Sequence, residues 1–458
     1  MAGPALDYAY RYPFESSIAS ASKSTAPSLR LATFTEEEVN PYFFAGRLLQ
    51  PFKVAKLLQG LVHLVRTRFF VHQAMLPAGI ADPIITAHED FLRFEVFSGC
   101  CSVYARLDLP PNAIDGDTLG CGTTNVDFNP ALVAALAKIR STDKLEFNIG
   151  ADEFVLERES AKVVEKRVQL PIRWLKGLVA ATSFGKQMEL RHEISGAHAT
   201  RFLRSIPRVQ DHRSRWSIQS AGQSLRISQR PGKHPDKEVM AGGLNRLRVL
   251  EDLTRFADKL RVYGHNEVEA SCWELDCGDA RFSMMMTHNV WRGFSGEGQG
   301  LEALAIEVPD KILKKTRASL KWQSIVDPNG LANKLISTED LESGLAVLST
   351  QGHVGFDVGA GHYFHRELPF DLEMVTKLQP RLKGAQKLLD QGNVTSTGKK
   401  SNHSYSVKST DTTHTVQLLE CLSKCTCPWY AKHQGRRGPC KHVLAAQIFE
   451  SNLQSKEA

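Results

Sequence analysis

The stretch KCTCPWYAKHQGRRGPCKHVLAAQIF, residues 424–449, decides the fold of the C-terminal part of the chain. It holds two tight pairs of potential metal ligands, Cys425 with Cys427 and Cys440 with His442. Three thiolates and one imidazole form a closed, four-coordinate ligand set for a structural Zn²⁺. A disulfide between residues two apart is disfavoured by geometry. The stretch therefore predicts a zinc site.

The neighbouring sequence predicts how these ligands are presented. SYSVKS at 404–409 and THTVQLLECL at 413–422 alternate polar and apolar residues, as paired strands do. After Cys440, the run KHVLAAQIF has helical spacing of its apolar residues, which places His442 in the first turn of a helix. Cys421 falls in the apolar pattern of a strand and is expected to be a buried thiol.

This order of Cys-x-Cys, a spacer and Cys-x-His resembles the SWIM zinc finger, a module of bacterial proteins, chromatin remodellers and transposases. The run YFHREL at 363–368 and the overall layout look like bacterial SWIM proteins. In that family the gene often neighbours those for an AAA+ ATPase and a von Willebrand A-type protein. The resemblance implies a partner of either kind.

The loop between the two ligand pairs is basic, and no acidic residue occurs from Cys421 to Phe449. A loop that a metal holds rigid is well suited to present charge to phosphates. We expect four side chains to contact nucleic acid, with DNA favoured: Lys432, Arg436, Arg437 and Lys441. Trp429 or Tyr430 is available to stack on a base, and covering the small zinc core is an equally good role for both.

Composition sets the class of protein. The chain has 458 residues, of which 42% are hydrophobic and 23% charged, as in globular proteins of several domains. Its nine cysteines show no disulfide framework, which favours a reducing, cytoplasmic setting. Neither a signal peptide nor a membrane span is expected. The net charge of +7 is mild for this length, so the distribution of charge matters more than its sum.

A helix followed by strands recurs about four times across 45–295, which suggests internal duplication. The first cycle has a helix over 51–70 and three strands. The second has a helix from Pro130, with strands expected at 143–150, 152–160 and 162–171. Such units, for example residues 125–157, resemble the domains of DNA sliding clamps. A generic α+β domain pair explains the pattern equally well. If the chain is clamp-like, the arginine-rich helix near 201–208 is the candidate to face nucleic acid.

The predicted fold class is therefore α+β and multidomain. The expected parts are a partly ordered arm at 1–40, α+β units at 41–180 and 181–300, a winged-helix-like module at 311–390 and a SWIM ββα finger at 400–450. No catalytic motif stands out, and four protein ligands leave zinc no open position for water. We expect a non-enzymatic zinc protein that binds nucleic acid; the alternative is a protein–protein adaptor.

Overall fold

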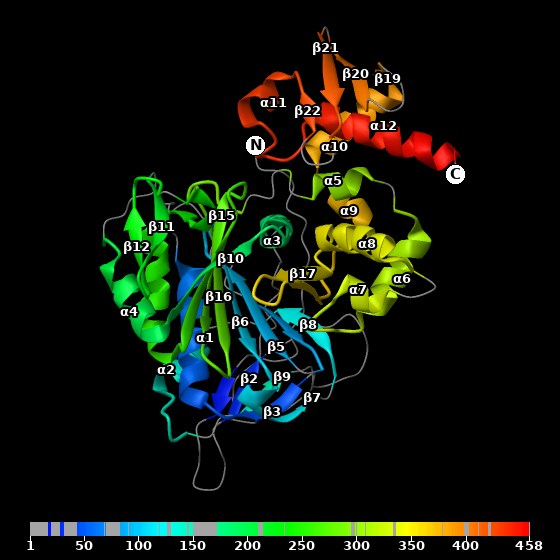
Figure 1. Cartoon of the computed structure of the whole chain (residues 1–458). Coiled ribbons are helices and arrows are strands. Elements are labelled where there is room, and N and C mark those ends of the chain that lie inside the picture. Colours follow the sequence, from blue (N-terminus) through cyan, green and yellow to red (C-terminus); the bar gives the residue numbers. More distant parts are fainter. Residues whose placement is uncertain are drawn as a thin grey trace.

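The computed structural model is shown in Figure 1. It describes residues 17–19, 28–31, 44–67, 69, 83–89, 91–118, 120–125, 130–143, 146–149, 172–208, 214–232, 234–294, 298, 300–306, 308–332, 336–377, 379–397, 403–410, 412–419 and 423–457. The strands expected at 152–160 and 162–171, Cys421 and most of the arm at 1–40 lie outside these residues.

An antiparallel sheet of eight strands is the largest element of the structure (Figure 1). In spatial order its strands are β10 (Glu189–Ser195), β14 (Lys259–Gly264), β15 (Ala270–Asp276), β16 (Arg281–Thr287), β6 (Val103–Leu109), β5 (Leu92–Phe97), β4 (Ile84–Ala87) and β8 (Gly122–Asn125). The strands predicted from the first and fourth cycles are confirmed as β4, β5, β6, β15 and β16. Pairing of β6 with β16 brings the first and last cycles into one sheet.

Helices cover one face of this sheet. They are α1 (Pro51–Arg66), α4 (Gly196–Ser205) and a 3₁₀ helix, η4 (Leu244–Phe256), while α2 (Pro130–Lys138) packs beside α1. Helix α1 begins with Pro51 in its first turn, where a missing N–H is harmless. Its buried Leu57 and Leu61 join a core with strand residues such as Phe94 and Phe282. The predicted helix over 51–70 is confirmed from Pro51 to Arg66, where α1 ends.

The other face of the sheet carries polar side chains that are nevertheless buried. Along β5, for example, Phe94 faces the helix-covered core, while Arg93 and Glu95 alternate to the opposite side and are each 1% exposed. Helix α3 (Ile172–Gly185) covers part of this face, and the hairpin of β17 (Val354–Asp357) and β18 (His362–His365) covers another part.

The hairpin is held on the sheet by what we call the ionic cluster, formed by Arg93, Arg106, Arg281, Asp108 and Asp357. Asp357 is the hairpin's contribution, and its carboxylate accepts from Arg106 and Arg281 at 2.6 Å each. Asp108 on β6 accepts from Arg93 at 2.8 Å and from Arg106 at 2.9 Å. Two carboxylates thus share three guanidinium groups in a buried space. Removing any one of these charges would leave a buried partner without its counter-charge, which is strongly destabilising.

A helical region links the hairpin to the C-terminal part. It comprises α5 (Leu301–Ala305), α6 (Asp310–Leu320), α7 (Pro328–Leu331), α8 (Thr338–Thr350), α9 (Leu372–Lys377) and α10 (Pro380–Asp390). Ser337 caps α8, because its hydroxyl accepts from the Asp340 N–H at 3.1 Å. The helical pattern of residues 373–393 is divided into two helices, because Pro380 cannot continue α9 and starts α10.

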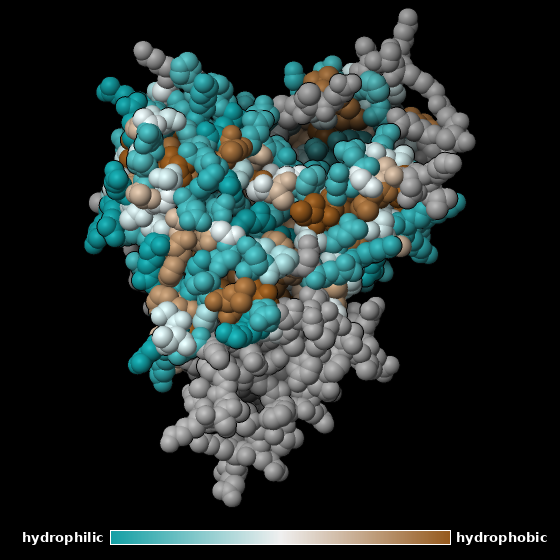
Figure 2. Space-filling model, turned by 60° about the horizontal axis from the view of Figure 1, so that its bottom comes forward, coloured by the Kyte–Doolittle hydropathy of each residue, from teal (hydrophilic) through white to brown (hydrophobic). Residues whose placement is uncertain are grey.

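Two smaller sheets complete the N-terminal part. One has the order β1 (Ser17–Ala19), β2 (Ser28–Leu31), β9 (Glu146–Ile149), β3 (Phe44–Leu48), β7 (Ile114–Thr118). The other has the order β12 (Ser224–Ser228), β11 (Arg215–Ala221), β13 (Val239–Gly242). On the face in Figure 2, hydrophobic residues form small separate patches among hydrophilic ones. Among the described residues, no helix combines the length and apolarity needed to cross a membrane.

Candidate metal centre

The last part of the chain builds a small sheet with two helices around the predicted ligands. Its strands are β19 (Val394–Ser396), β20 (Ser404–Ser409), β21 (Thr412–Gln417) and β22 (Lys424–Cys425), and its helices are α11 (Pro428–His433) and α12 (Lys441–Glu457). Cys425 ends β22, Cys427 caps α11, Cys440 precedes α12, and His442 lies in the first turn of α12. The expected strands and final helix are confirmed, whereas α11 lies where a plain loop was expected.

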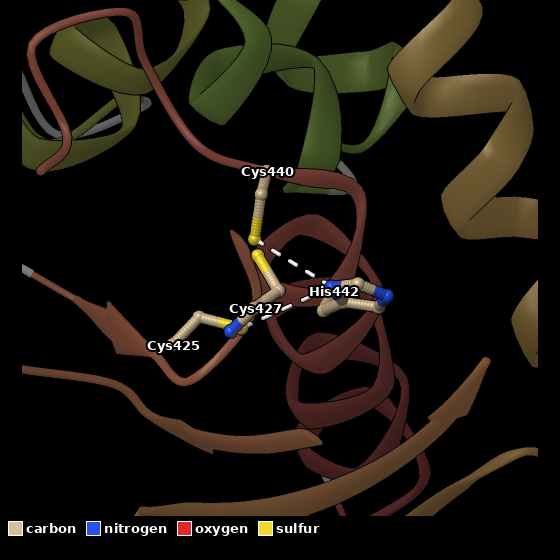
Figure 3. Close-up of side chains that lie close together, drawn as sticks. All are labelled: Cys425, Cys427, Cys440 and His442. Atoms are coloured by element: carbon tan, nitrogen blue, oxygen red, sulfur yellow. Dashed lines mark hydrogen bonds between the residues drawn. The ribbon is translucent and has the colours of Figure 1, made fainter. Parts of the chain in front are cut away.

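The four side chains point toward one another (Figure 3). One ligand atom from each lies within 4.8 Å of all the others, and each residue is at most 6% exposed. His442 presents Nδ1 to Cys425 Sγ at 3.8 Å and to Cys440 Sγ at 3.9 Å. A tetrahedral Zn²⁺ with ordinary bond lengths sets such atoms about 3.6–3.8 Å apart. The donor set and its spacing therefore fit zinc held through three sulfur atoms and Nδ1.

Backbone N–H groups support the thiol ligands from behind. The N–H of Cys427 donates to Cys425 Sγ at 3.4 Å, that of Tyr430 to Cys427 Sγ at 3.3 Å, and that of Val443 to Cys440 Sγ at 3.5 Å. Such bonds orient the ligand and stabilise negative charge on sulfur. Each sulfur is thus prepared for the thiolate form that binds metal.

The thiols also influence one another's ionisation. A hydrogen bond from Cys425 lowers the pKa of Cys440 to about 4, against the effect of burial. The same bond raises the pKa of Cys425, which keeps its proton while it donates. The metal-free cluster thus gives up its first proton at Cys440, which presents a thiolate to an arriving cation.

Comparison with known proteins agrees with this geometry. Residues 414–446 match the family model of the SWIM zinc finger. The chain carries a SWIM zinc finger. No curated protein matches the chain significantly. Among solved structures, proliferating cellular nuclear antigen from Entamoeba histolytica is similar at 9% identity and a TM-score of 0.33, over 54% of this chain and 98% of that chain.

The SWIM finger shares its hydrophobic core with helices outside the matched residues. Leu301 and Ala305 of α5 and Leu382, Ala385 and Leu388 of α10 pack in one cluster with Val416, Val443, Leu444 and the three ligand cysteines. Figure 1 shows α5 and α10 directly beside the finger. The metal centre is therefore built into a larger unit that includes these two helices.

Two contacts fix the loop between the ligand pairs, residues 434–439, which we call the zinc loop. Gly298 and Gly438 meet backbone to backbone: a Cβ on Gly438 would lie 2.4 Å from the Gly298 oxygen, and both residues have positive φ. Arg381 of α10 donates from Nη1 to the carbonyl oxygens of Arg437, at 2.9 Å, and Pro439, at 2.7 Å. Both contacts hold the loop in the position that brings Cys440 to the other ligands.

We predict that Arg381→Ala weakens zinc binding roughly tenfold, the lower end of what lost supporting contacts cost a metal site. Without the guanidinium, two carbonyl groups beside Cys440 lose their donor. Competition for zinc against a coloured chelator measures this. Lys383→Ala is the matched control. Lys383 is an exposed cation on the same helix and, among the described residues, makes no contact that supports a zinc ligand. Equal zinc affinity in both variants would contradict a supporting role for Arg381.

The four residues expected to contact nucleic acid lie in or next to the zinc loop. Lys432 and Arg436 are exposed, and Arg437 and Lys441 are partly exposed. Helix α10 adds two cations that were not among the predicted contacts: Lys383 and Lys387 are exposed, and Gly384 between them lies against the Lys441 side chain. The spacing of these lysines in a helix was visible in the sequence, but their position beside the zinc loop depends on the packing of α10 on α12.

Trp429 and Tyr430 are partly buried and pack on the core of the finger. The Trp429 ring also lies under the Arg381 guanidinium at 4.9 Å, a cation–π contact. Both aromatic residues thus cover the zinc core, one of the two roles considered for them, and Trp429 helps to position Arg381.

Proposed function

We propose that this SWIM-finger protein binds nucleic acid, with DNA favoured, and that its zinc is structural and serves no catalysis. The observation that carries the proposal is a rigid basic surface. It joins the zinc loop and its flanks to α10, and we call it the zinc-loop surface: Lys383, Lys387, Lys432, Arg436, Arg437 and Lys441. From Ser423 to Phe449 the sequence has no acidic residue to offset these charges. Zinc and Arg381 order the backbone in advance, so less entropy is lost when phosphates bind.

We predict that the double variant Lys383→Ala/Lys432→Ala binds DNA about tenfold more weakly than the unchanged protein. Loss of two phosphate contacts should also flatten the slope of log affinity against log salt by roughly 1.8 for duplex DNA. Fluorescence anisotropy of labelled single- and double-stranded DNA across a salt series measures both. The control is Lys311→Ala/Lys314→Ala, which removes two exposed charges from α6, away from the finger (Figure 1).

The alternative is an adaptor in which the same basic surface meets an acidic protein, with an AAA+ ATPase or a von Willebrand A-type protein as the proposed partner. Zinc at about one per chain, together with no nucleic-acid binding at low salt, would favour the adaptor and overturn the DNA proposal. A basic surface serves either role, because phosphates and carboxylates both accept from arginine and lysine.

We also propose that the N-terminal part is clamp-like and offers a second surface to nucleic acid. Supporting this, cations project from the layer of helices α1, α2, α4 and η4, among them the exposed Arg66, Lys138, Arg201, Arg204 and Arg255. Acidic Glu251 and Asp252 offset only part of this charge. The double variant Arg201→Ala/Arg204→Ala is included in the same DNA titration. Weaker DNA binding by this variant would support the second surface. Unchanged affinity and an unchanged salt slope would exclude α4 from that surface. The winged-helix-like reading of residues 311–390 stays a proposal as well.

A further inference from the structure

A fifth potential donor, His414 of β21, lies beside the metal centre. The centroid of its ring is 4.4 Å from that of His442, and the two ring planes are inclined at 45°. Among the described residues, however, His414 is not in the group whose donor atoms could share one metal ion; that group is Cys425, Cys427, Cys440 and His442. Four donors already complete a tetrahedral zinc site. His414 can therefore influence zinc only through its contact with a ligand.

The register of the finger's sheet directs the His414 side chain toward the metal centre. Val416 pairs with Cys425 across β21 and β22, and it is buried in the core that contains the ligand cysteines. Side chains two residues apart on a strand point to the same face, so His414 shares the face of Val416. Thr413 and Thr415 point to the other face and are exposed. The strand thus fixes the position of the His414 ring.

The His442 imidazole lacks the support that a metal-bound histidine usually has. Its Nδ1 faces the sulfur atoms, and Figure 3 shows the second ring nitrogen, Nε2, pointing away from them. A metal-bound histidine usually donates this second N–H to a carboxylate, a carbonyl group or water, and that bond fixes the orientation of the ring. In His442, Nε2 is buried and finds no hydrogen-bond partner among the described residues. The orientation of the ring therefore depends on what packs against its face.

We propose that His414 is a positioning residue of the metal centre, because its ring packs against the His442 imidazole and keeps Nδ1 directed at the zinc position. The torsion that turns a histidine ring about its Cβ–Cγ bond has broad minima. Without a contact on its face, the imidazole could turn Nδ1 away from the metal at little cost. This inference concerns zinc binding alone and is independent of the proposed binding of nucleic acid.

The zinc affinity of the full chain, measured by competition with a coloured chelator, tests the proposal. We expect His414→Ala to weaken zinc binding about tenfold, the lower end of the effect of losing an outer contact of a metal ligand. His414→Phe keeps a ring against His442 and should restore most of the affinity. Thr413→Ala is the matched control, because Thr413 is exposed on the opposite face of the same strand. It should bind zinc as tightly as the unchanged protein.

Substitution of Co²⁺ for zinc distinguishes positioning of His442 from general stabilisation of the finger. The visible absorption bands of Co²⁺ report which atoms coordinate the metal. At saturating Co²⁺, we expect the bands of His414→Ala to change, because a fraction of the His442 rings leaves the metal and water takes their place. The bands of His414→Phe should match those of the unchanged protein.

Three results would overturn the proposal. Zinc affinity of His414→Ala equal to that of the unchanged protein would show that His442 needs no support from this ring. Weaker zinc binding with an unchanged Co²⁺ spectrum would mean that His414 only stabilises the finger. An equal loss of affinity in His414→Phe and His414→Ala would exclude ring packing as the cause. If His414→Ala does not fold, His414→Phe decides alone: retained affinity and spectrum support the proposal, and their loss overturns it.

Discussion

Cys440→Ser is expected to abolish zinc binding and to unfold the SWIM finger. A serine hydroxyl does not replace a thiolate ligand, and binding of structural zinc supplies about 10–16 kcal/mol in small zinc modules. Because α5 and α10 share the finger's core with the ligand cysteines, both helices should lose stability with it. Hydrogen exchange should be fast from Val394 to Ala446 and accelerated in α5 and α10. Strands β5 and β6, which lie in another core, should keep their protection.

The matched control is Cys121→Ser, which removes a partly buried thiol outside the metal centre. It should keep zinc at about one per chain and leave the exchange of the finger unchanged. Removing zinc with a chelator should reproduce the exchange pattern of Cys440→Ser. A metal-free finger that stays protected throughout would show that the hydrophobic core folds without the metal, and would refute this account.

Asp357→Asn is expected to destabilise the protein by about 3–5 kcal/mol, the usual result of removing one partner from a buried ion pair. Asparagine keeps the size of the side chain, so the loss reports the charge. Arg106 and Arg281 would lose a carboxylate 2.6 Å away, and the hairpin β17–β18 would lose its main polar attachment to the sheet. Chemical unfolding monitored by circular dichroism measures the effect.

Glu373→Ala is the control for that experiment. It breaks the exposed pair of Glu373 with Lys377 on α9, which should matter little because water screens both charges. If Asp357→Asn were as mild as this control, the ionic cluster would not be what attaches the hairpin.

The ionic cluster also predicts how stability depends on pH. Burial by itself would raise the pKa of Asp357 and Asp108, but Arg106, Arg93 and Arg281 outweigh it and hold both pKa values below the ordinary range. A carboxylate with a lowered pKa in the folded state contributes stability above its unfolded pKa, about 3.9, and this contribution is lost as the pH falls. The free energy of unfolding should therefore drop from about pH 5 downward, and less steeply in Asp357→Asn.

Local sequence was enough to predict the metal centre. The pairs Cys425 with Cys427 and Cys440 with His442 are each only two residues apart, so short-range backbone geometry brings each pair together. Period-two and helical patterns likewise predicted β20, β21 and the start of α12. The helix α11 was missed because Cys427 provides its cap through sulfur, a signal that sequence rules for oxygen caps do not contain.

The sequence alone determined a zinc-binding SWIM finger, because its four ligands lie between residues 425 and 442 and the N–H groups that bond to the thiols lie within three residues of them. Only the tertiary structure decided what surrounds it. Arg381, 56 residues from Arg437, holds the zinc loop, and Arg93 contacts Asp357 across 264 residues. Alternating polar residues, as on β5 and β6, are typical of a solvent-facing side of a sheet, but here the hairpin buries them by ion pairing. Such contacts depend on which distant segments pack together, and no local pattern records that.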